Sequence, residues 1–119
     1  VLSLHCAATA ETHHIVNRDT LALMKPSAII INTARGVLID SAALADALNA
    51  GSIYAAGLDV VEREPILPEN PLLNAKNCLI TPHAAWLPVD VRKRLVDLAA
   101  ENLDAYLHDR KLNRVDLEG

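Results

Sequence analysis

The chain has 119 residues, of which 51% are hydrophobic and 22% charged, and its formal net charge at pH 7 is −4. This composition is typical of a small globular domain and argues against a disordered chain. No apolar run reaches the ~20 residues that cross a bilayer, and acidic residues surround the one basic cluster, Arg92–Arg94, so we expect neither membrane insertion nor nucleic-acid binding.

The first part of the chain predicts two strands separated by a short helix. Val1–Cys6 has the pattern of a buried strand, and Ala7–His14 is the loop after it. Asn17–Met24 predicts a helix, which Pro26 ends because proline cannot continue the hydrogen-bond ladder. Ala28–Asn32 contains three isoleucines in a row and predicts the central strand.

A helix is expected next over Ala42–Asn49, since Leu44, Ala47 and Leu48 are spaced as one helical face. Asp40 or Ser41 is the expected N-cap. Two further strands are predicted, at 53–61 and 77–80, with a proline-bearing loop between them. Strands that alternate with helices indicate βαβ units and a parallel sheet, so the fold class is α/β.

The last predicted element is a long amphipathic helix over Val89–His108. Its apolar face comprises Val91, Leu95, Leu98, Ala99, Leu103, Tyr106 and Leu107. The tail at 109–119 is polar, and we expect it to be loosely held. With four strands and three helices, the chain amounts to roughly half to two-thirds of a doubly wound domain.

Three charged or titratable side chains stand just after three predicted strands: Arg35, Glu64 and His83. Since parallel strands end at one edge of a sheet, these groups can converge there. Arg35 would hold a carboxylate with two hydrogen bonds. Histidines titrate near neutrality, so His83 could move a proton, with Glu64 fixing its tautomer. The alternatives are a surface or ion-paired arginine, a turn histidine and a solvated loop carboxylate.

Other polar groups carry weaker signals. Asp59 lies near the end of an apolar strand and needs a partner, for which a local backbone contact or a strand-end cap suffices. The two cysteines, Cys6 and Cys78, lack metal-ligand spacing, so we interpret them as buried, reduced thiols of a cytoplasmic protein. No metal site is predicted, and three histidines are expected to be solvated. These are His13, His14 and His108.

Several motifs occur together in one order: SLHCAATAETHHIVN, INTARG, GLDV followed by EREP, TPH, and LAAENLDAYL. This set is similar to the C-terminal part of the D-isomer-specific 2-hydroxyacid dehydrogenase family, over about Val1–Val115. The form TPHAAW departs from the commoner TPHIGG and looks more like the glycerate dehydrogenase or hydroxypyruvate reductase members. The resemblance implies a partial Rossmann-type dinucleotide-binding domain at residues 1–108, including the closing helix.

The resemblance also implies roles for individual residues. Arg35 would bind the substrate carboxylate, His83 would be the general acid/base, and Glu64 would be its partner. The residues implied at the dinucleotide are His5, Cys6, Ala7, Thr33, Ala34, Arg35, Asp59 and His83, with Asp59 at the nicotinamide carboxamide. Trp86 would either edge the substrate pocket or pack at a helix start. The implied cofactor is NAD or NADP, the substrate is a small 2-oxo acid such as hydroxypyruvate or glyoxylate, and the parent enzyme is a homodimer.

A phosphate-binding glycine loop is missing from the chain. It has four glycines and no Gly-x-Gly-x-x-Gly. We therefore expect a C-terminal piece of a longer enzyme that is inactive alone and, with a strand edge exposed, prone to self-association. The alternative is a dinucleotide-sensing binding protein of the same fold, similar to the transcriptional corepressors that resemble these dehydrogenases.

Overall fold

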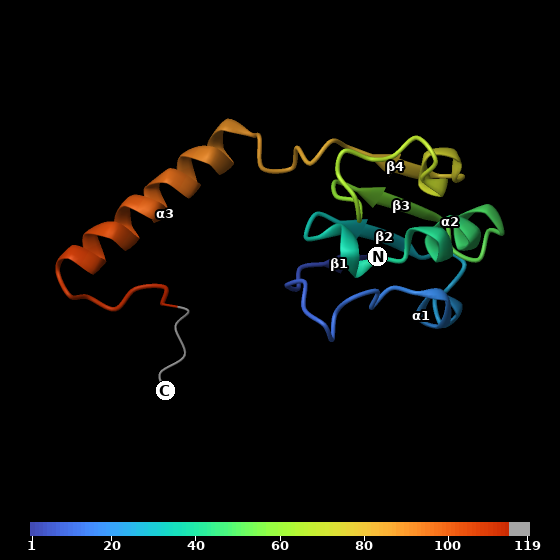
Figure 1. The fold of residues 1–119 in the computed structure, drawn as a ribbon, viewed down its shortest axis with the longest axis horizontal. Helices are drawn as coiled ribbons and strands as arrows, with labels where there is room; N and C mark the ends of the chain where they lie inside the picture. Colours follow the sequence, from blue (N-terminus) through green and yellow to red (C-terminus); the bar gives the residue numbers. More distant parts are fainter. Residues whose placement is uncertain (115–119) are drawn as a thin grey trace. The chain divides into compact units, whose positions relative to one another are not determined.

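The computed structural model describes residues 1–114, which divide into two compact units, Val1–Ala85 and a second beginning at Trp86. The first unit is built on a four-stranded parallel sheet in the order β1-β2-β3-β4 (Figure 1). The strands are β1 (Leu2–Leu4), β2 (Ile29–Asn32), β3 (Ala55–Leu58) and β4 (Cys78–Ile80). The predicted α/β class and parallel sheet are confirmed.

The strands are shorter than predicted, most clearly at the third one. β3 covers four of the nine residues predicted at 53–61, and these four are the ones that pair with the four residues of β2. β1 likewise ends at Leu4 rather than Cys6, so Cys6 lies in an exposed loop. The prediction that Cys6 is buried is therefore wrong. Cys78 is half-buried, and burial raises the pKa of its thiol.

Side-chain caps fix where the two helices of the first unit begin. The Asn17 side chain accepts hydrogen bonds from the backbone N–H groups of Asp19 and Thr20 and so caps α1 (Arg18–Ala22). Asp40, not Ser41, caps α2 (Ser41–Asn49), because its side chain accepts hydrogen bonds from the backbone N–H groups of Ala42 and Ala43. The helix predicted over Asn17–Met24 is thus confirmed with a shorter extent.

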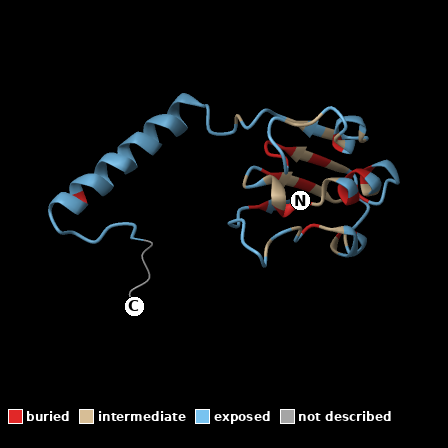
Figure 2. Cartoon of the chain, in the orientation of Figure 1, coloured by how far each residue is buried: buried red, intermediate tan, exposed pale blue. Residues whose placement is uncertain are grey.

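One face of the sheet is buried and the other is open (Figure 2). Ile30, Ala56 and Leu58 point into a core to which the helices contribute Leu21 and Leu44. On the opposite face Ile31, Gly57 and Leu79 are neighbours in register, and Leu79 is 69% exposed. The alternation along each strand, rather than a continuous buried run, follows from this one-sided packing.

Two short 3₁₀ helices complete the first unit: η1 (Gly36–Leu38) and η2 (Pro71–Asn74). At η1 the chain passes very close to the loop after β3. A Cβ on Gly36 would lie 1.9 Å from the backbone carbonyl carbon of Val61 and 2.4 Å from the nitrogen of Glu62. Only glycine permits this approach, so the Arg35–Gly36 corner and the loop at 61–62 are packed backbone against backbone.

The second unit consists of α3 (Val89–Leu107) and the start of the tail. The predicted long helix is confirmed, although most of its predicted apolar face is exposed, with Leu95 and Tyr106 among the most open (Figure 2). Arg110 folds back, its N–H donating to the Ala105 carbonyl and its side chain pairing with Asp104. The expectation of a loosely held tail stays a prediction, and residues 115–119 lie outside the described part.

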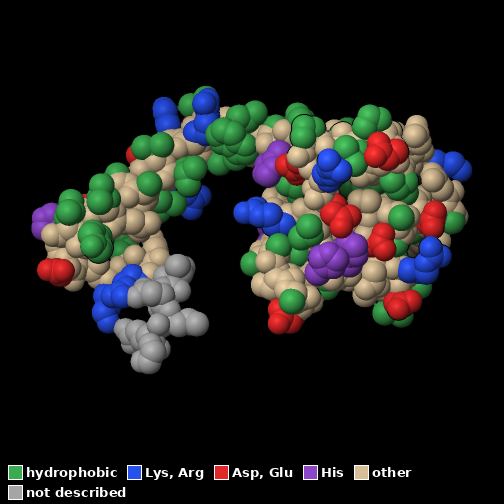
Figure 3. Space-filling model, in the orientation of Figure 1, with side chains coloured by type: hydrophobic (Ala, Val, Ile, Leu, Met, Phe, Trp, Pro, Cys, Tyr) green, Lys and Arg blue, Asp and Glu red, His purple; other side chains and the backbone are tan. Residues whose placement is uncertain are grey.

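Across the described residues, no helix combines the length and apolar character that crossing a bilayer requires. On the face of the first unit drawn in Figure 3, acidic and basic side chains are interspersed rather than gathered by sign.

Candidate active site

The carboxyl ends of all four strands lie at one edge of the sheet. His5, Thr33, Asp59 and Thr81 directly follow β1, β2, β3 and β4. The loops that leave this edge carry every candidate residue of the first unit. Ligands of open parallel sheets bind at this edge, so the topology brings together residues up to 78 positions apart in sequence, from His5 to His83.

The loops after β1 and β2 enclose a hollow of about 560 Å³. Its lining contains the predicted dinucleotide residues of both loops, namely His5, Cys6, Ala7, Thr33, Ala34 and Arg35, together with Ala8. Arg35 has an extended backbone and an exposed side chain, whose Nη1 donates to the Ala34 carbonyl oxygen at 2.7 Å. The structure thus places these six residues around one cavity.

The buried side chain of Asn32 shapes this corner. Its Nδ2 donates to the Arg35 carbonyl at 2.9 Å, and its Oδ1 accepts from the Ala34 N–H at 3.0 Å. Asn32 is fully buried, so both bonds replace contacts with water. Sequence reasoning treated Asn32 only as the end of a strand. The available signal was a polar amide directly after three isoleucines, which must find partners inside the protein.

On the other side of the edge, His83 and Glu64 are hydrogen-bonded. His83 Nδ1 lies 2.7 Å from Glu64 Oε2, while Glu64 Oε1 accepts from the Val61 N–H at 3.1 Å. The hydrogen bond from His83 is the main reason that the pKa of Glu64 is lowered, although partial burial opposes it. Glu64 is therefore an ionised carboxylate that orients the imidazole through Nδ1.

Asp59 holds the backbone of the corner that carries His83. One carboxylate oxygen accepts from the Thr81 hydroxyl at 2.5 Å and from the Ala84 N–H at 2.8 Å, and the other accepts from the Ala85 N–H at 2.8 Å. Burial raises the pKa of Asp59, but these hydrogen bonds outweigh it and leave the pKa lowered. The local backbone contact considered for Asp59 is present in the structure.

His83 itself has a left-handed backbone, with φ of 53°. Its N–H donates to the Asp59 carbonyl at 2.9 Å and to the Thr81 carbonyl at 3.0 Å. A non-glycine residue in this region is uncommon and requires support from its surroundings. Asp59 supplies that support from both its backbone and its side chain.

Two further hollows adjoin these residues. One, of about 660 Å³, is lined by the loop at 61–66 and the corner at 80–83, including Glu64 and His83. The other, of about 290 Å³, lies over the open sheet face, with Ile31 and Gly57 on its floor and Thr33 and Asp59 at its rim. A Cβ on Gly57 would come within 3.1 Å of the Ile31 side chain, so the absence of a side chain at this position leaves space in the hollow.

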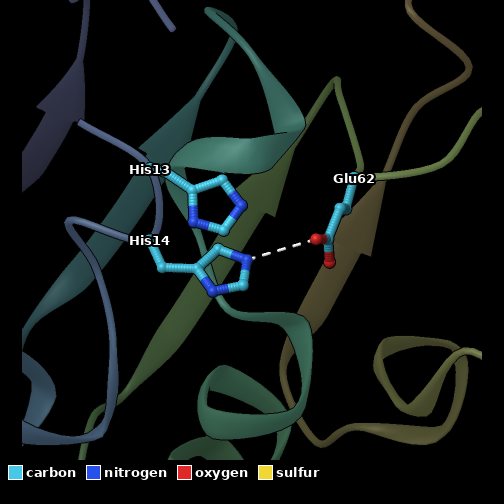
Figure 4. Close-up of side chains that lie close together, drawn as sticks. All are labelled: His13, His14 and Glu62. Carbon is cyan, nitrogen blue, oxygen red and sulfur yellow. Dashed lines mark hydrogen bonds and ion pairs between the residues drawn. The ribbon is translucent and has the colours of Figure 1, made fainter. Parts of the chain in front are cut away.

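Among the residues outside these hollows, His14 corrects the sequence prediction. It is half-buried rather than solvated, and its Nε2 lies 3.2 Å from Glu62 Oε1 (Figure 4). Trp86 is about half exposed and begins the second unit, so its place at a substrate pocket stays a prediction.

Fold and site together define an α/β domain of the Rossmann type, with a carboxylate–histidine pair and an arginine at its ligand-binding edge. The family model described as "D-isomer specific 2-hydroxyacid dehydrogenase, NAD binding domain" matches residues 1–85. The chain belongs to this family. The domain boundary predicted at residue 108 remains a prediction.

Individual relatives agree with this placement. The chain is 52% identical to a hydroxypyruvate reductase of Blautia hydrogenotrophica, over 97% of the chain and 36% of the relative. A glyoxylate reductase from Paecilomyes thermophila superposes with a TM-score of 0.83 and 38% identity, over 95% and 34% of the two chains. An acyclic imino acid reductase solved with NADPH and D-Arg superposes with a TM-score of 0.81 and 37% identity, over 93% of this chain and 35% of the reductase. The chain spans about a third of the length of these relatives.

Proposed function

We propose that the full-length protein is an NAD(P)H-dependent reductase of a small 2-oxo acid, with hydroxypyruvate and glyoxylate as the first candidates. The observation that carries this proposal is the 2.7 Å hydrogen bond between Glu64 and His83 at the edge where such folds bind ligands. The names of the reductases to which the chain is similar support the substrate class.

In this proposal His83 is the proton donor. A 2-oxo acid becomes a 2-hydroxy acid when a hydride reaches the carbonyl carbon and a proton reaches the carbonyl oxygen. Glu64 binds Nδ1, so the proton leaves from Nε2 of the imidazolium. The carboxylate stabilises the charged ring and fixes its orientation. The aspartate of a Ser-His-Asp triad acts on its histidine in the same way. In the reverse direction the same nitrogen accepts the alcohol proton.

Arg35 is proposed to bind the substrate carboxylate. Its guanidinium is exposed beside the hollow after β2, and its present hydrogen bond is to the neighbouring Ala34 carbonyl rather than to an acidic side chain. A planar fork of donors matches a carboxylate with two parallel bonds, which orients the adjacent carbonyl. Asn32 acts as a positioning residue, because it fixes the backbone from which Arg35 projects.

The residues present fit a dinucleotide at this edge. The hollow over Ile31 and Gly57 is apolar with a polar rim at Thr33 and Asp59, which suits a flat ring with one amide group. When bound, the reduced nicotinamide supplies the hydride. The family is described as NAD-binding, and one similar structure holds NADPH, so the proposal covers both cofactors. We also propose a cytoplasmic homodimer for the full-length protein.

Substitutions in the full-length protein test the assignment. His83→Ala and Glu64→Gln should each lower kcat with hydroxypyruvate by about 10²- to 10⁴-fold, since general acid/base catalysis contributes that much. Glu69→Gln is the matched control, because Glu69 is an exposed carboxylate on the same loop region. Near-normal kcat in both His83→Ala and Glu64→Gln would overturn the proposal.

A further inference from the structure

Three potential metal ligands meet outside the candidate active site, beside η1. His13, His14 and Glu62 each offer one ligand atom, and these atoms all lie within 4.8 Å of one another (Figure 4). The two imidazole rings stack with centroids 3.9 Å apart. Figure 3 shows histidine side chains gathered next to acidic ones at the surface of the first unit.

The backbone holds His14 in place from both sides. Its N–H donates to the Val37 carbonyl at 2.9 Å, and its carbonyl accepts from Asn17 Nδ2 at 2.9 Å. Its φ of 50° is left-handed, a conformation that is uncommon for residues other than glycine. Val16, two residues on, forms a parallel bridge with Ile39. The loop that carries both histidines is therefore attached to the segment that contains η1.

Glu62 reaches the same place from the loop after β3. Its backbone nitrogen is packed against Gly36 at the start of η1. The 36–39 segment thus contacts the histidine loop on one side and the Glu62 loop on the other, so the fold itself brings together ligands that are 48 residues apart in sequence. A site built on two anchored loops does not need to be assembled by the ion.

The distances suit a transition metal. With bonds of about 2.0–2.1 Å, two ligands of a tetrahedral ion are about 3.3 Å apart. His14 Nε2 and Glu62 Oε1 are 3.2 Å apart, and His13 is exposed enough to turn its ring toward them. Two imidazoles and one carboxylate favour Zn²⁺ or a neighbouring late transition ion over Mg²⁺ or Ca²⁺, which prefer oxygen ligands.

We propose that His13, His14 and Glu62 bind a divalent transition-metal ion, with Zn²⁺ as the reference ion and water completing its coordination. The ion would join the 9–14 loop to the loop at 61–64, which also carries Glu64. It would thereby restrain the loop that positions Glu64, without touching substrate. This proposal does not depend on the proposed reductase activity, because the ligands and the binding test belong to the chain itself.

Titration calorimetry of the 119-residue chain with ZnCl₂ at pH 7.5, in a non-chelating buffer, tests the proposal. We expect one equivalent of Zn²⁺ to bind and to raise the Tm, since only the folded chain assembles the three ligands. His13→Asn, His14→Asn and Glu62→Gln should each weaken binding at least tenfold. His13→Asn is the decisive variant, because His13 is exposed and its loss should leave the fold intact.

Two control variants locate the ion. His108→Asn removes an exposed histidine directly after α3, and His83→Asn removes the other histidine–carboxylate pair of the first unit. Both variants should keep the wild-type Zn²⁺ affinity. Three results would overturn the proposal: no detectable Zn²⁺ binding, unchanged affinity in folded His13→Asn, or loss of binding in folded His83→Asn alone.

Discussion

His83 Nδ1 lies 2.7 Å from Glu64 Oε2, and this contact joins the corner after β4 to the loop after β3. A second carboxylate, Asp59, holds the backbone of the same corner. The ring and the main chain of His83 are thus positioned by different acidic residues. This division gives each carboxylate its own measurable consequence, orientation of the imidazole for Glu64 and stability of the corner for Asp59.

Asp59→Asn should destabilise the first unit. The amide keeps one acceptor oxygen and places an NH₂ group against an N–H of Ala84 or Ala85, so charge-assisted bonds are lost inside a buried site. We expect a loss of about 2–3 kcal/mol in the free energy of unfolding, measured with urea. Asp46→Asn, at an exposed ion pair with Arg18, should change it by less than about 0.5 kcal/mol. Equal effects would contradict the role given to Asp59.

Gly36→Ala should be far more damaging than Gly51→Ala. The new Cβ at Gly36 would overlap the Val61 backbone, which cannot move without displacing the loop that carries Glu64. We expect a cost of about 3 kcal/mol or more. Gly51 has open space around it, and its φ of 70° alone should cost about 1 kcal/mol. Thermal unfolding of the two variants side by side gives the comparison, and similar Tm values would refute the close packing.

Stability should fall in acid through these two carboxylates. The pKa values of Glu64 and Asp59 are lowered in the folded chain from ordinary values of 4.5 and 3.8. A lowered folded pKa gives stability that is present above the ordinary pKa and is lost as the pH falls through the folded value. The stability gap between wild type and Asp59→Asn should therefore be full at about pH 6 and shrink below about pH 4. A gap that stays constant to about pH 2.5 would contradict the ionised state of Asp59.

Arg35→Lys, like Arg35→Gln, should lower the activity of the full-length protein, although lysine keeps the positive charge. A lysine keeps the charge but lacks the planar fork, so a carboxylate held by two parallel bonds loses its orientation. We expect kcat/KM for hydroxypyruvate to fall at least tenfold in Arg35→Lys, and further in Arg35→Gln. Arg63→Lys, at an exposed arginine near the site, is the control. Full activity in Arg35→Lys would leave only a charge role for this residue.

The parallel sheet was predictable because short apolar runs alternated with helical patterns and turn residues. The placement of Arg35, Glu64 and His83 on loops at one edge followed from that topology, although Arg35 lines a different hollow from Glu64 and His83. The strand ends were less predictable, because they depend on how many residues a neighbouring strand can pair. The structural roles of Asn32 and Asp59 required the turns themselves, since a polar residue after a strand does not reveal which N–H groups it will meet.

The contact between His14 and Glu62 could not be predicted either. Histidines in a polar loop have the pattern of solvated side chains, and only the close approach at Gly36 brings the second loop beside them. Long-range pairs of side chains in loops leave no periodic signal in a sequence. Here they depend on a single glycine that the sequence marks only as a corner.

The most direct test of the reductase assignment is the oxidation of NADH and NADPH by the full-length protein with hydroxypyruvate and glyoxylate. The 119-residue chain is assayed beside it and should show no turnover, since it has no Gly-x-Gly-x-x-Gly loop. We predict that the full-length protein oxidises at least one cofactor with at least one of these acids. If it oxidises neither cofactor with either acid while still binding dinucleotide, the reductase assignment is contradicted and a dinucleotide-sensing role takes its place.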